Sequence, residues 1–229
     1  MRMRKKKHLD ERLEACGEYF IKAMTDDLNF ETSVEKKEYF DFKELFGNDN
    51  PVELEIGCGK GGFVNEKARL NPDVNFLAVE KIGNVIVSAC ETAKDNDLKN
   101  VRFLKCSAEY LAKYIPPKSI SRIYLNFSCP YPKNKYKNHR LTNRKFLKIY
   151  SDVLADGAEI HQKTDNMHFF EYSLEEFSFV GYKMKNISLD LHKSDFEGNI
   201  VTEYEKRFSE MGFPIYRLEA YLEGEKTDE

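Results

Sequence analysis

The chain has 229 residues, of which 41% are hydrophobic and 33% are charged, a balance typical of soluble globular proteins and not of disordered or membrane-spanning ones. This length allows one α/β domain with a large core and a short extension. We expect a basic arm and helical extension over residues 1–50, the main domain over 51–222 and an acidic tail over 223–229. No apolar run approaches the roughly 20 residues that cross a bilayer, and no signal peptide follows the basic N-terminus, so we expect a cytoplasmic protein.

The cysteines argue against disulfides and against a zinc site, because they are odd in number, widely spaced and free of any CxxC pair. They are Cys16, Cys58, Cys90, Cys106 and Cys129. His139, within a basic stretch, has no Cys, His or acidic ligand near it in the sequence. We therefore expect reduced thiols and no metal.

The net charge of -3 counts against a nucleic-acid partner, since RNA-binding domains are usually basic. The cations are nevertheless segregated into two clusters. One comprises Arg2, Arg4, Lys5, Lys6 and Lys7; the other, with no acidic residue inside it, comprises Lys133, Lys135, Lys137, Arg140, Arg144, Lys145 and Lys148. Such segregation can form a phosphate-binding face on an acidic protein. A solvated loop and a frayed terminus are the alternative.

Short β-branched or aromatic runs alternate with helical patterns along the chain. The predicted strands are 52–56, 75–79, 101–104, 122–127, 159–163, 183–191 and 215–221, and helices are predicted at 63–70, 84–94, 144–154 and 169–179. This alternation predicts βαβ units in a mostly parallel sheet with helices on both faces. An exposed loop over 193–202 suggests an antiparallel edge formed by the last two strands.

The most specific local signal is a strand that runs into a glycine cluster and then a helix, with the sequence Glu53-Leu-Glu-Ile-Gly-Cys-Gly-Lys-Gly-Gly62. Gly57 and Gly59 would allow a tight turn and a close approach of ligand to backbone. A nucleotide-containing cofactor is therefore expected here, and an ordinary tight turn is the alternative.

Two carboxylates suggest which cofactor binds. Glu80 ends the second strand, 23 residues after Gly57, near the spacing of a carboxylate that holds ribose hydroxyls. Glu55 lies two residues before Gly57, where a dinucleotide site continues an apolar strand. A carboxylate there suits a cationic cofactor and would repel a pyrophosphate, which favours S-adenosylmethionine over NAD. A Walker phosphate loop is excluded, because Lys60 is followed by Gly61 and not by Ser or Thr.

The fourth strand leads into a rigid aromatic loop, Cys129-Pro130-Tyr131-Pro132. Prolines stiffen such a loop, and Tyr131 could stack on a purine. Lys133, Lys135, Lys137 and Arg140 follow at once, where an RNA backbone would need cations. Alternatively, the prolines only end the strand and the tyrosine packs on the surface.

Two later segments are unusually polar. Asp165, after the fifth strand, could accept hydrogen bonds from a base edge, or could cap the next helix. The spacing of Thr202 and Glu205 predicts a capping box at the start of a helix.

Together these segments resemble the bacterial tRNA (guanine-N7)-methyltransferases of the TrmB type over nearly the whole chain. The residues that carry the resemblance are Arg2-Met-Arg-Lys-Lys6, Glu53 to Phe63, Ala78-Val-Glu-Lys81, Tyr124 to Lys133, His139-Arg-Leu141, Lys163-Thr-Asp-Asn166, Asn199 to Glu205 and Pro214-Ile-Tyr-Arg217. The resemblance implies a Rossmann-like, seven-stranded class I methyltransferase fold, S-adenosylmethionine as cofactor, and methylation of guanine 46 in the variable loop of tRNA.

The resemblance also implies residue roles. Cofactor-binding positions are Glu55, Gly57, Gly59, Glu80, Ser107 and Cys129; substrate-binding positions are Lys133, Asp165, Thr202, Glu203, Tyr204 and Glu205. The sequence leaves open a monomer or a homodimer.

Two positions depart from the family pattern. Cys129 stands where the family has an aspartate at the centre of the site, and Ser107 stands where an acidic or amide residue commonly meets the adenine. Guanine N7 carries a lone pair and no proton, so attack needs no general base, and positioning should supply most of the rate. A thiol is a weak acceptor in place of that aspartate. Four hypotheses remain: an active methyltransferase, a slow methyltransferase, an inactive tRNA-binding relative and an NAD-linked oxidoreductase.

Overall fold

The computed structural model describes residues 5–23, 25 and 28–223, which fall into two compact units, Met1–Pro116 and Pro117–Glu229. Arg2 and Arg4 of the first basic cluster, and most of the acidic tail, lie outside the described residues. The domain boundaries expected near residues 50 and 222 stay predictions. Among the described residues, no helix combines the length and apolarity needed to span a membrane.

The first unit contains a parallel sheet in the order β1-β4-β3-β2. Its strands are β1 (Phe20–Ile21), β2 (Val52–Ile56), β3 (Asn75–Val79) and β4 (Val101–Leu104). The last three have the predicted bounds, because each is a short run buried at every position. Strand β1 was not predicted, since two residues are too few to show a periodic pattern.

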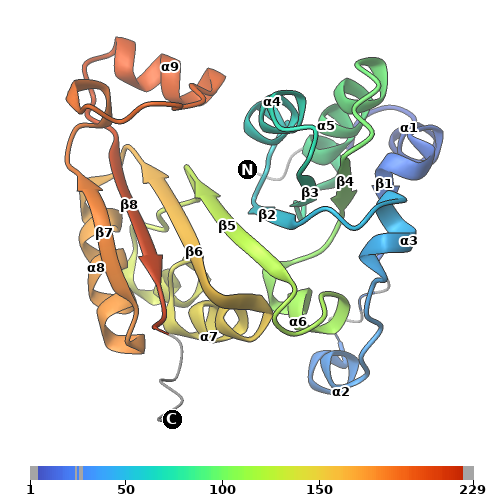
Figure 1. The fold of residues 1–229 in the computed structure, drawn as a ribbon, viewed down its shortest axis with the longest axis horizontal. Helices are drawn as coiled ribbons and strands as arrows, with labels where there is room; N and C mark the ends of the chain where they lie inside the picture. The colour runs from blue at the N-terminus through green and yellow to red at the C-terminus, as the bar shows by residue number, and fades with distance from the viewer. Residues whose placement is uncertain (1–4, 24, 26–27, 224–229) are drawn as a thin grey trace. The chain divides into compact units, whose positions relative to one another are not determined.

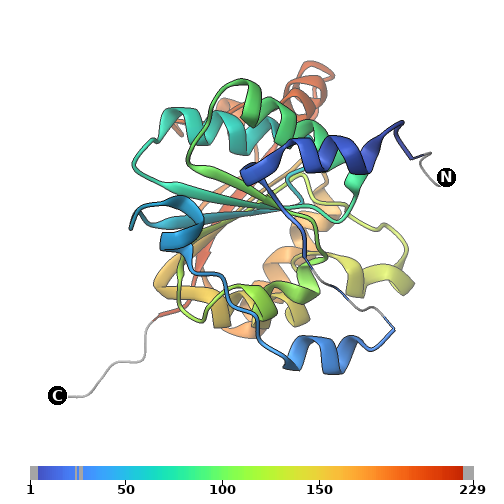
Figure 2. The same cartoon turned by 90° about the vertical axis from the view of Figure 1, so that its right-hand side faces the viewer.

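Helices pack on both faces of this parallel sheet (Figure 2). They are α1 (Leu9–Ala15), α2 (Phe30–Glu35), α3 (Phe42–Phe46), α4 (Gly62–Leu70), α5 (Gly83–Asp95) and α6 (Leu111–Tyr114), with short 3-10 turns at Gly17–Tyr19 and Ala108–Tyr110. Leu9 and Leu13 bury the inner side of α1, and the Arg12 guanidinium pairs with Glu91 on α5 at 2.6 Å. The described part of the predicted N-terminal extension thus contains strand β1 as well as α1, α2 and α3, and it belongs to the first unit.

The second unit contains strands in the order β5-β6-β8-β7. They are β5 (Ile120–Asn126), β6 (Leu154–Thr164), β7 (Lys183–Ser188) and β8 (Tyr216–Tyr221). Strands β5 and β6 are parallel, whereas β8 is antiparallel to both β6 and β7. The antiparallel edge expected from the sequence is therefore confirmed. Eight strands are described in place of the seven expected, because of β1.

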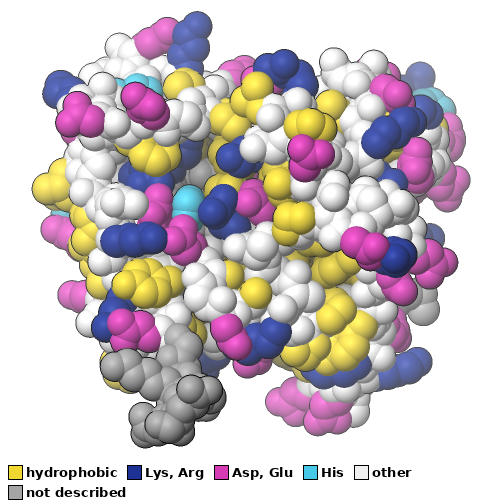
Figure 3. Space-filling view, in the orientation of Figure 1, with side chains coloured by type: hydrophobic (Ala, Val, Ile, Leu, Met, Phe, Trp, Pro, Cys, Tyr) yellow, Lys and Arg dark blue, Asp and Glu magenta, His cyan; other side chains and the backbone are white. Residues whose placement is uncertain are grey.

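Helices α7 (Arg144–Val153) and α8 (Met167–Val180) cover one face of these strands, and α9 (Glu203–Glu210) lies at the end of the sheet where β5 and β6 finish (Figure 1). Further 3-10 turns span Asn134–His139 and Leu191–Lys193. Phe146, Phe170 and Phe177 fill the space under α7 and α8. Over β6, β8 and β7, the face drawn in Figure 3 shows acidic, basic and histidine side chains beside one another.

Candidate functional site

The glycine loop of the first unit follows β2 and is tied to the end of β3. The backbone N–H groups of Gly57 and Cys58 donate to the carbonyl of Val79 at 2.8 and 3.1 Å. Gly57 and Gly59 have φ values of 79° and 58°, in the left-handed region that favours glycine. The predicted tight turn is therefore present at the carboxyl end of the strand.

Gly61 was missed as a site residue, although it carries the strictest steric requirement. Its φ is 80°, and a Cβ built on it would lie 2.7 Å from Cβ of Ala89 on α5. The signal in the sequence was the third glycine of the run. Without a side chain there, α4 and α5 can approach closely behind the loop.

Two carboxylates converge on this loop. Glu55 lies within β2 and is only 3% exposed, while Glu80 directly follows β3, the neighbouring strand. Burial first, and then the negative charges of Glu55 and Glu80, raise the pKa of the Cys58 thiol well above its usual range. One Glu80 oxygen accepts the backbone N–H of Ile82 at 2.9 Å, which orients that carboxylate. The loop is thus an acidic environment, which favours a cationic ligand over a pyrophosphate.

Ser107 follows β4, the next strand of the same sheet, and its hydroxyl hydrogen-bonds the carboxylate of Glu109. The sequence interpretation named Ser107 alone and missed Glu109, two residues further on. The acidic group that the family pattern expects at this position is therefore close by in the chain.

In the second unit, the aromatic loop begins where β5 ends. The N–H of Phe127 donates to the carbonyl of Lys163 at 2.8 Å, which ties the loop to β6. Phe127 and Tyr131 both have positive φ, 51° and 40°, a costly conformation for bulky residues. The backbone of this loop is therefore strained, which is common in ligand-binding segments.

The cations after this loop differ in their surroundings. Lys133, Lys135 and Lys137 are exposed, as contacts with an RNA backbone require. Arg140 is only 9% exposed, and its guanidinium donates to the backbone carbonyls of Pro130 and Tyr131. The structure therefore holds Arg140 in internal contacts, in contrast to the expected surface contact with tRNA.

Asp165 directly follows β6 and bonds the Tyr204 hydroxyl. Burial, the negative charge of Asp165 and a hydrogen bond with Asp165 raise the pKa of the Tyr204 hydroxyl, and Cys129 adds a smaller effect. The Tyr204 ring lies 5.0 Å from the ring of Phe127. Asp165 is not the cap of α8, because Asn166 accepts the N–H of Phe169 at 2.8 Å. A carboxylate and a phenol thus lie beside Phe127 of the strained loop.

Thr202 caps α9 as the sequence predicted, since its hydroxyl accepts the N–H of Glu205 at 3.0 Å. Glu205, however, is fully buried, and its carboxylate accepts from Lys163 Nζ and Asn199 Nδ2, each at 2.7 Å. The Glu205 carboxylate is therefore held by internal partners, and its expected contact with the substrate stays a prediction. Glu205 holds the start of α9 against β6, while Glu203 is exposed.

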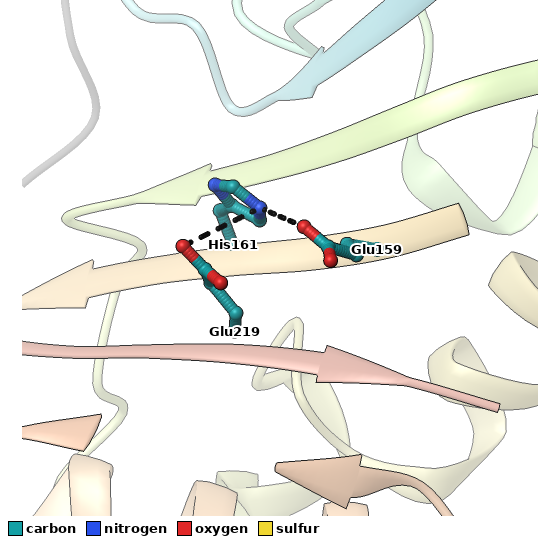
Figure 4. Close-up of side chains that lie close together, drawn as sticks. All are labelled: Glu159, His161 and Glu219. Atoms are coloured by element: carbon teal, nitrogen blue, oxygen red, sulfur yellow. Dashed lines mark hydrogen bonds and ion pairs between the residues drawn. The ribbon is translucent and has the colours of Figure 1, made fainter. Parts of the chain in front are cut away.

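A second polar cluster lies on β6 and β8, formed by Glu159, His161 and Glu219 (Figure 4). His161 Nε2 is 2.7 Å from a carboxylate oxygen of Glu159 and 3.9 Å from one of Glu219. These ligand types could hold a metal ion. Both carboxylates are already paired with cations, Glu159 with Lys185 at 2.5 Å and Glu219 with Arg217, so a divalent ion would have to displace them. The sequence interpretation did not identify this cluster.

Comparison with known proteins places these features in a wider context. Residues 49–218 match the protein family described as "Putative methyltransferase". A tRNA (guanine-N(7)-)-methyltransferase of Geobacillus sp. is 51% identical over 178 residues, which cover 78% of this chain and 81% of that protein. The protein of the same name from Streptococcus uberis is 42% identical over 222 residues, 97% of this chain and all of that protein.

Solved structures show the same fold. An antibiotic-related methyltransferase superposes with a TM-score of 0.57 at 15% identity, covering 78% of this chain and 90% of that one. The 16S rRNA methyltransferase KamB gives a TM-score of 0.56 at 16% identity, covering 88% and 96%. The predicted Rossmann-like α/β fold is thereby confirmed.

Proposed function

The chain belongs to the family of S-adenosylmethionine-dependent tRNA (guanine-N7)-methyltransferases, and on that premise we propose which guanine it modifies and which of its residues carry the reaction. Its reaction transfers a methyl group to N7 of a guanine in tRNA. The proposed target is guanine 46 of the variable loop. The proposed setting is the cytoplasm, with the protein acting as a monomer or homodimer. The alternative of an NAD-linked oxidoreductase is set aside by the family membership.

The cofactor is assigned to the loop after β2. The acidic surroundings of Cys58 suit the positive charge of the sulfonium and the amino group of the methionine moiety. Glu55 would meet the amino group, and Glu80, at the end of β3, would accept the ribose hydroxyls. Gly57 and Gly59 would let the ligand approach the backbone, and Ser107 with Glu109 would meet the adenine.

The guanine is assigned to Asp165, Tyr204 and the loop that holds Cys129, and the packing of the Tyr204 ring, which bonds Asp165, against the Phe127 ring at 5.0 Å is the observation that carries the proposal. Asp165 would accept hydrogen bonds from N1–H and the N2 amino group of the base. The Tyr204 hydroxyl, which bonds Asp165, orients that carboxylate. Lys133 would add a cation near the substrate, Thr202 would fix the start of α9, and Glu203 would contact the substrate from its exposed position.

Methyl transfer at N7 depends on orientation more than on proton transfer. The lone pair of N7 forms a bond to the methyl carbon while the bond from that carbon to sulfur breaks, and sulfur keeps the electron pair. The base gains a positive charge, so a nearby carboxylate stabilises the transition state. Asp165 can supply that charge, whereas Cys129 is a weak acceptor unless it ionises. We propose that Asp165 performs much of the role of the aspartate that this chain lacks at position 129.

The test is Asp165→Asn, which keeps the size of the side chain and removes its charge. Loss of a charge-assisted hydrogen bond predicts a fall in kcat/KM for unmodified tRNA of about 10- to 100-fold, with the affinity for S-adenosylhomocysteine unchanged. Glu171→Gln, on the exposed side of α8, is the matched control for the loss of one negative charge. Full kcat/KM in Asp165→Asn would refute the assignment.

Cys129→Asp restores the family residue and separates the remaining hypotheses. A large gain in kcat means that the native site is slow, and a loss means that the site is built around sulfur. A wild-type protein that binds both ligands without turnover, and that gains activity only through Cys129→Asp, would be identified as a tRNA-binding relative.

A further inference from the structure

The buried arginine of the basic stretch is the feature that the proposed function leaves unexplained. Lys133, Lys135 and Lys137 point to solvent, but Arg140 is 9% exposed although it belongs to the same run of cations. Burying a guanidinium is costly unless its donors are satisfied. The partners of Arg140 therefore indicate what it does.

Those partners are the backbone of the loop that precedes it. Arg140 Nε donates to the carbonyl of Pro130 at 2.9 Å, and Nη2 donates to the carbonyl of Tyr131 at 3.0 Å. A planar guanidinium can reach two adjacent carbonyls in this way, whereas the ammonium of a lysine offers a single point of charge. The two bonds fix the two peptide groups that flank Tyr131.

The guanidinium is itself held by the helices of the second unit. Its carbon lies 4.3 Å from the centre of the Tyr172 ring on α8. The Tyr172 hydroxyl accepts a hydrogen bond from Asn143 Nδ2 at 2.6 Å, and Asn143 caps α7. The loop is thus braced, through Arg140, against two regular helices.

The brace acts on a strained segment. Tyr131 has a φ of 40°, and a bulky residue in that conformation costs roughly 1–3 kcal/mol unless its surroundings enforce it. The ring of Tyr131 then packs 5.6 Å from the ring of His139. Release of the two carbonyls would let the backbone relax and the ring move.

We propose that Arg140 is a positioning residue that locks Pro130 and Tyr131 in the geometry needed at the target base, and that it does not bind a tRNA phosphate. The inference rests on the proposed function, in which this loop lies beside the guanine. Its consequence is that Arg140 controls kcat, while the exposed lysines control the strength of tRNA binding.

Two substitutions separate positioning from phosphate binding. Arg140→Lys keeps the charge and loses the paired bonds, so we expect kcat at saturating tRNA to fall about 10- to 100-fold, the loss associated with misplacement by about 1 Å. Arg140→Gln removes the charge. We expect the logarithm of its association constant for tRNA to fall with the logarithm of the salt concentration at the same slope as in the wild type. A phosphate contact would reduce that slope by about 0.7–0.9, as expected for the control Lys135→Gln.

Tyr172→Leu tests the brace without changing any charge. Removal of the ring under Arg140 should lower kcat in the same direction as Arg140→Lys, with the salt slope and the affinity for S-adenosylhomocysteine unchanged. Thermal unfolding and circular dichroism of each variant identify any that do not fold. Near-normal kcat in a folded Arg140→Lys protein, or a reduced slope in Arg140→Gln, overturns the inference.

Tyr131→Ala distinguishes a failure of this inference from a failure of the proposed site. If Tyr131→Ala loses kcat while Arg140→Lys retains it, the loop acts at the base but Arg140 does not position it. If Tyr131→Ala retains full kcat, the loop is not at the target base, and the proposed site and this inference both fail.

Discussion

The buried pair formed by Lys163 and Glu205 gives the most quantitative prediction. Lys163 Nζ donates to the Glu205 carboxylate at 2.7 Å, to Asn199 Oδ1 at 2.9 Å and to the carbonyl of Ile200 at 3.0 Å. Both charged side chains are nearly or fully buried. Lys163→Met would leave the carboxylate with Asn199 and His192 as its remaining close partners. Breaking a buried pair in this way costs about 3–5 kcal/mol.

Urea unfolding at neutral pH measures that cost, and Glu205→Gln completes a double-mutant cycle. The double variant buries no uncompensated charge. We therefore expect its loss of unfolding free energy to be smaller, by about 1–3 kcal/mol, than the sum of the losses in the two single variants. The single variants should also lower kcat, since the pair holds Thr202 and Tyr204 in place. A loss below about 1 kcal/mol in Lys163→Met, the range of an exposed ion pair, would refute the reasoning.

Two further predictions concern the glycine loop and the polar cluster around His161. Gly61→Ala combines positive φ with a 2.7 Å contact to Ala89, so it should destabilise the protein by more than about 2 kcal/mol. Gly59→Ala has positive φ but meets only open space, so it should cost about 1 kcal/mol. Equal losses of stability in thermal unfolding of the two variants would contradict this prediction. Burial lowers the pKa of His161, so the unfolded chain binds a proton first as pH falls through about 6.5. The free energy of unfolding should therefore decrease between about pH 7 and pH 5.5, and it should decrease less steeply in His161→Gln. Parallel curves of unfolding free energy against pH for the wild type and the variant would show that another group titrates.

The sequence predicted those parts of the fold in which local pattern and burial agree. Strands β2, β3 and β4 were placed to the residue because every position in them is buried. Strand β6 starts at Leu154, five residues before the predicted start, because Asp156 and Gly157 interrupt the apolar pattern within it. Strand β7 ends at Ser188, before the predicted Leu191, because the chain turns into the 3-10 segment that begins there.

The motif of the glycine loop predicted that Glu55 and Glu80 lie at the ends of neighbouring strands, while their roles toward the cofactor stay predictions. The sequence did not show where a charged side chain makes internal contacts. Glu205 and Lys163 are 42 residues apart, and nothing in the sequence near either residue indicates that the two side chains form a buried ion pair. Arg140 reads as one more cation in a basic run, because its partners are backbone carbonyls, which every residue has.

The most direct test of the central claim is incubation of the purified protein with methyl-labelled S-adenosylmethionine and unmodified tRNA, followed by nuclease digestion and identification of the labelled nucleoside. We predict label in 7-methylguanosine from the variable loop, and its loss when guanine 46 is replaced in the transcript. Label in another nucleoside, or no label although both ligands bind, would contradict the account.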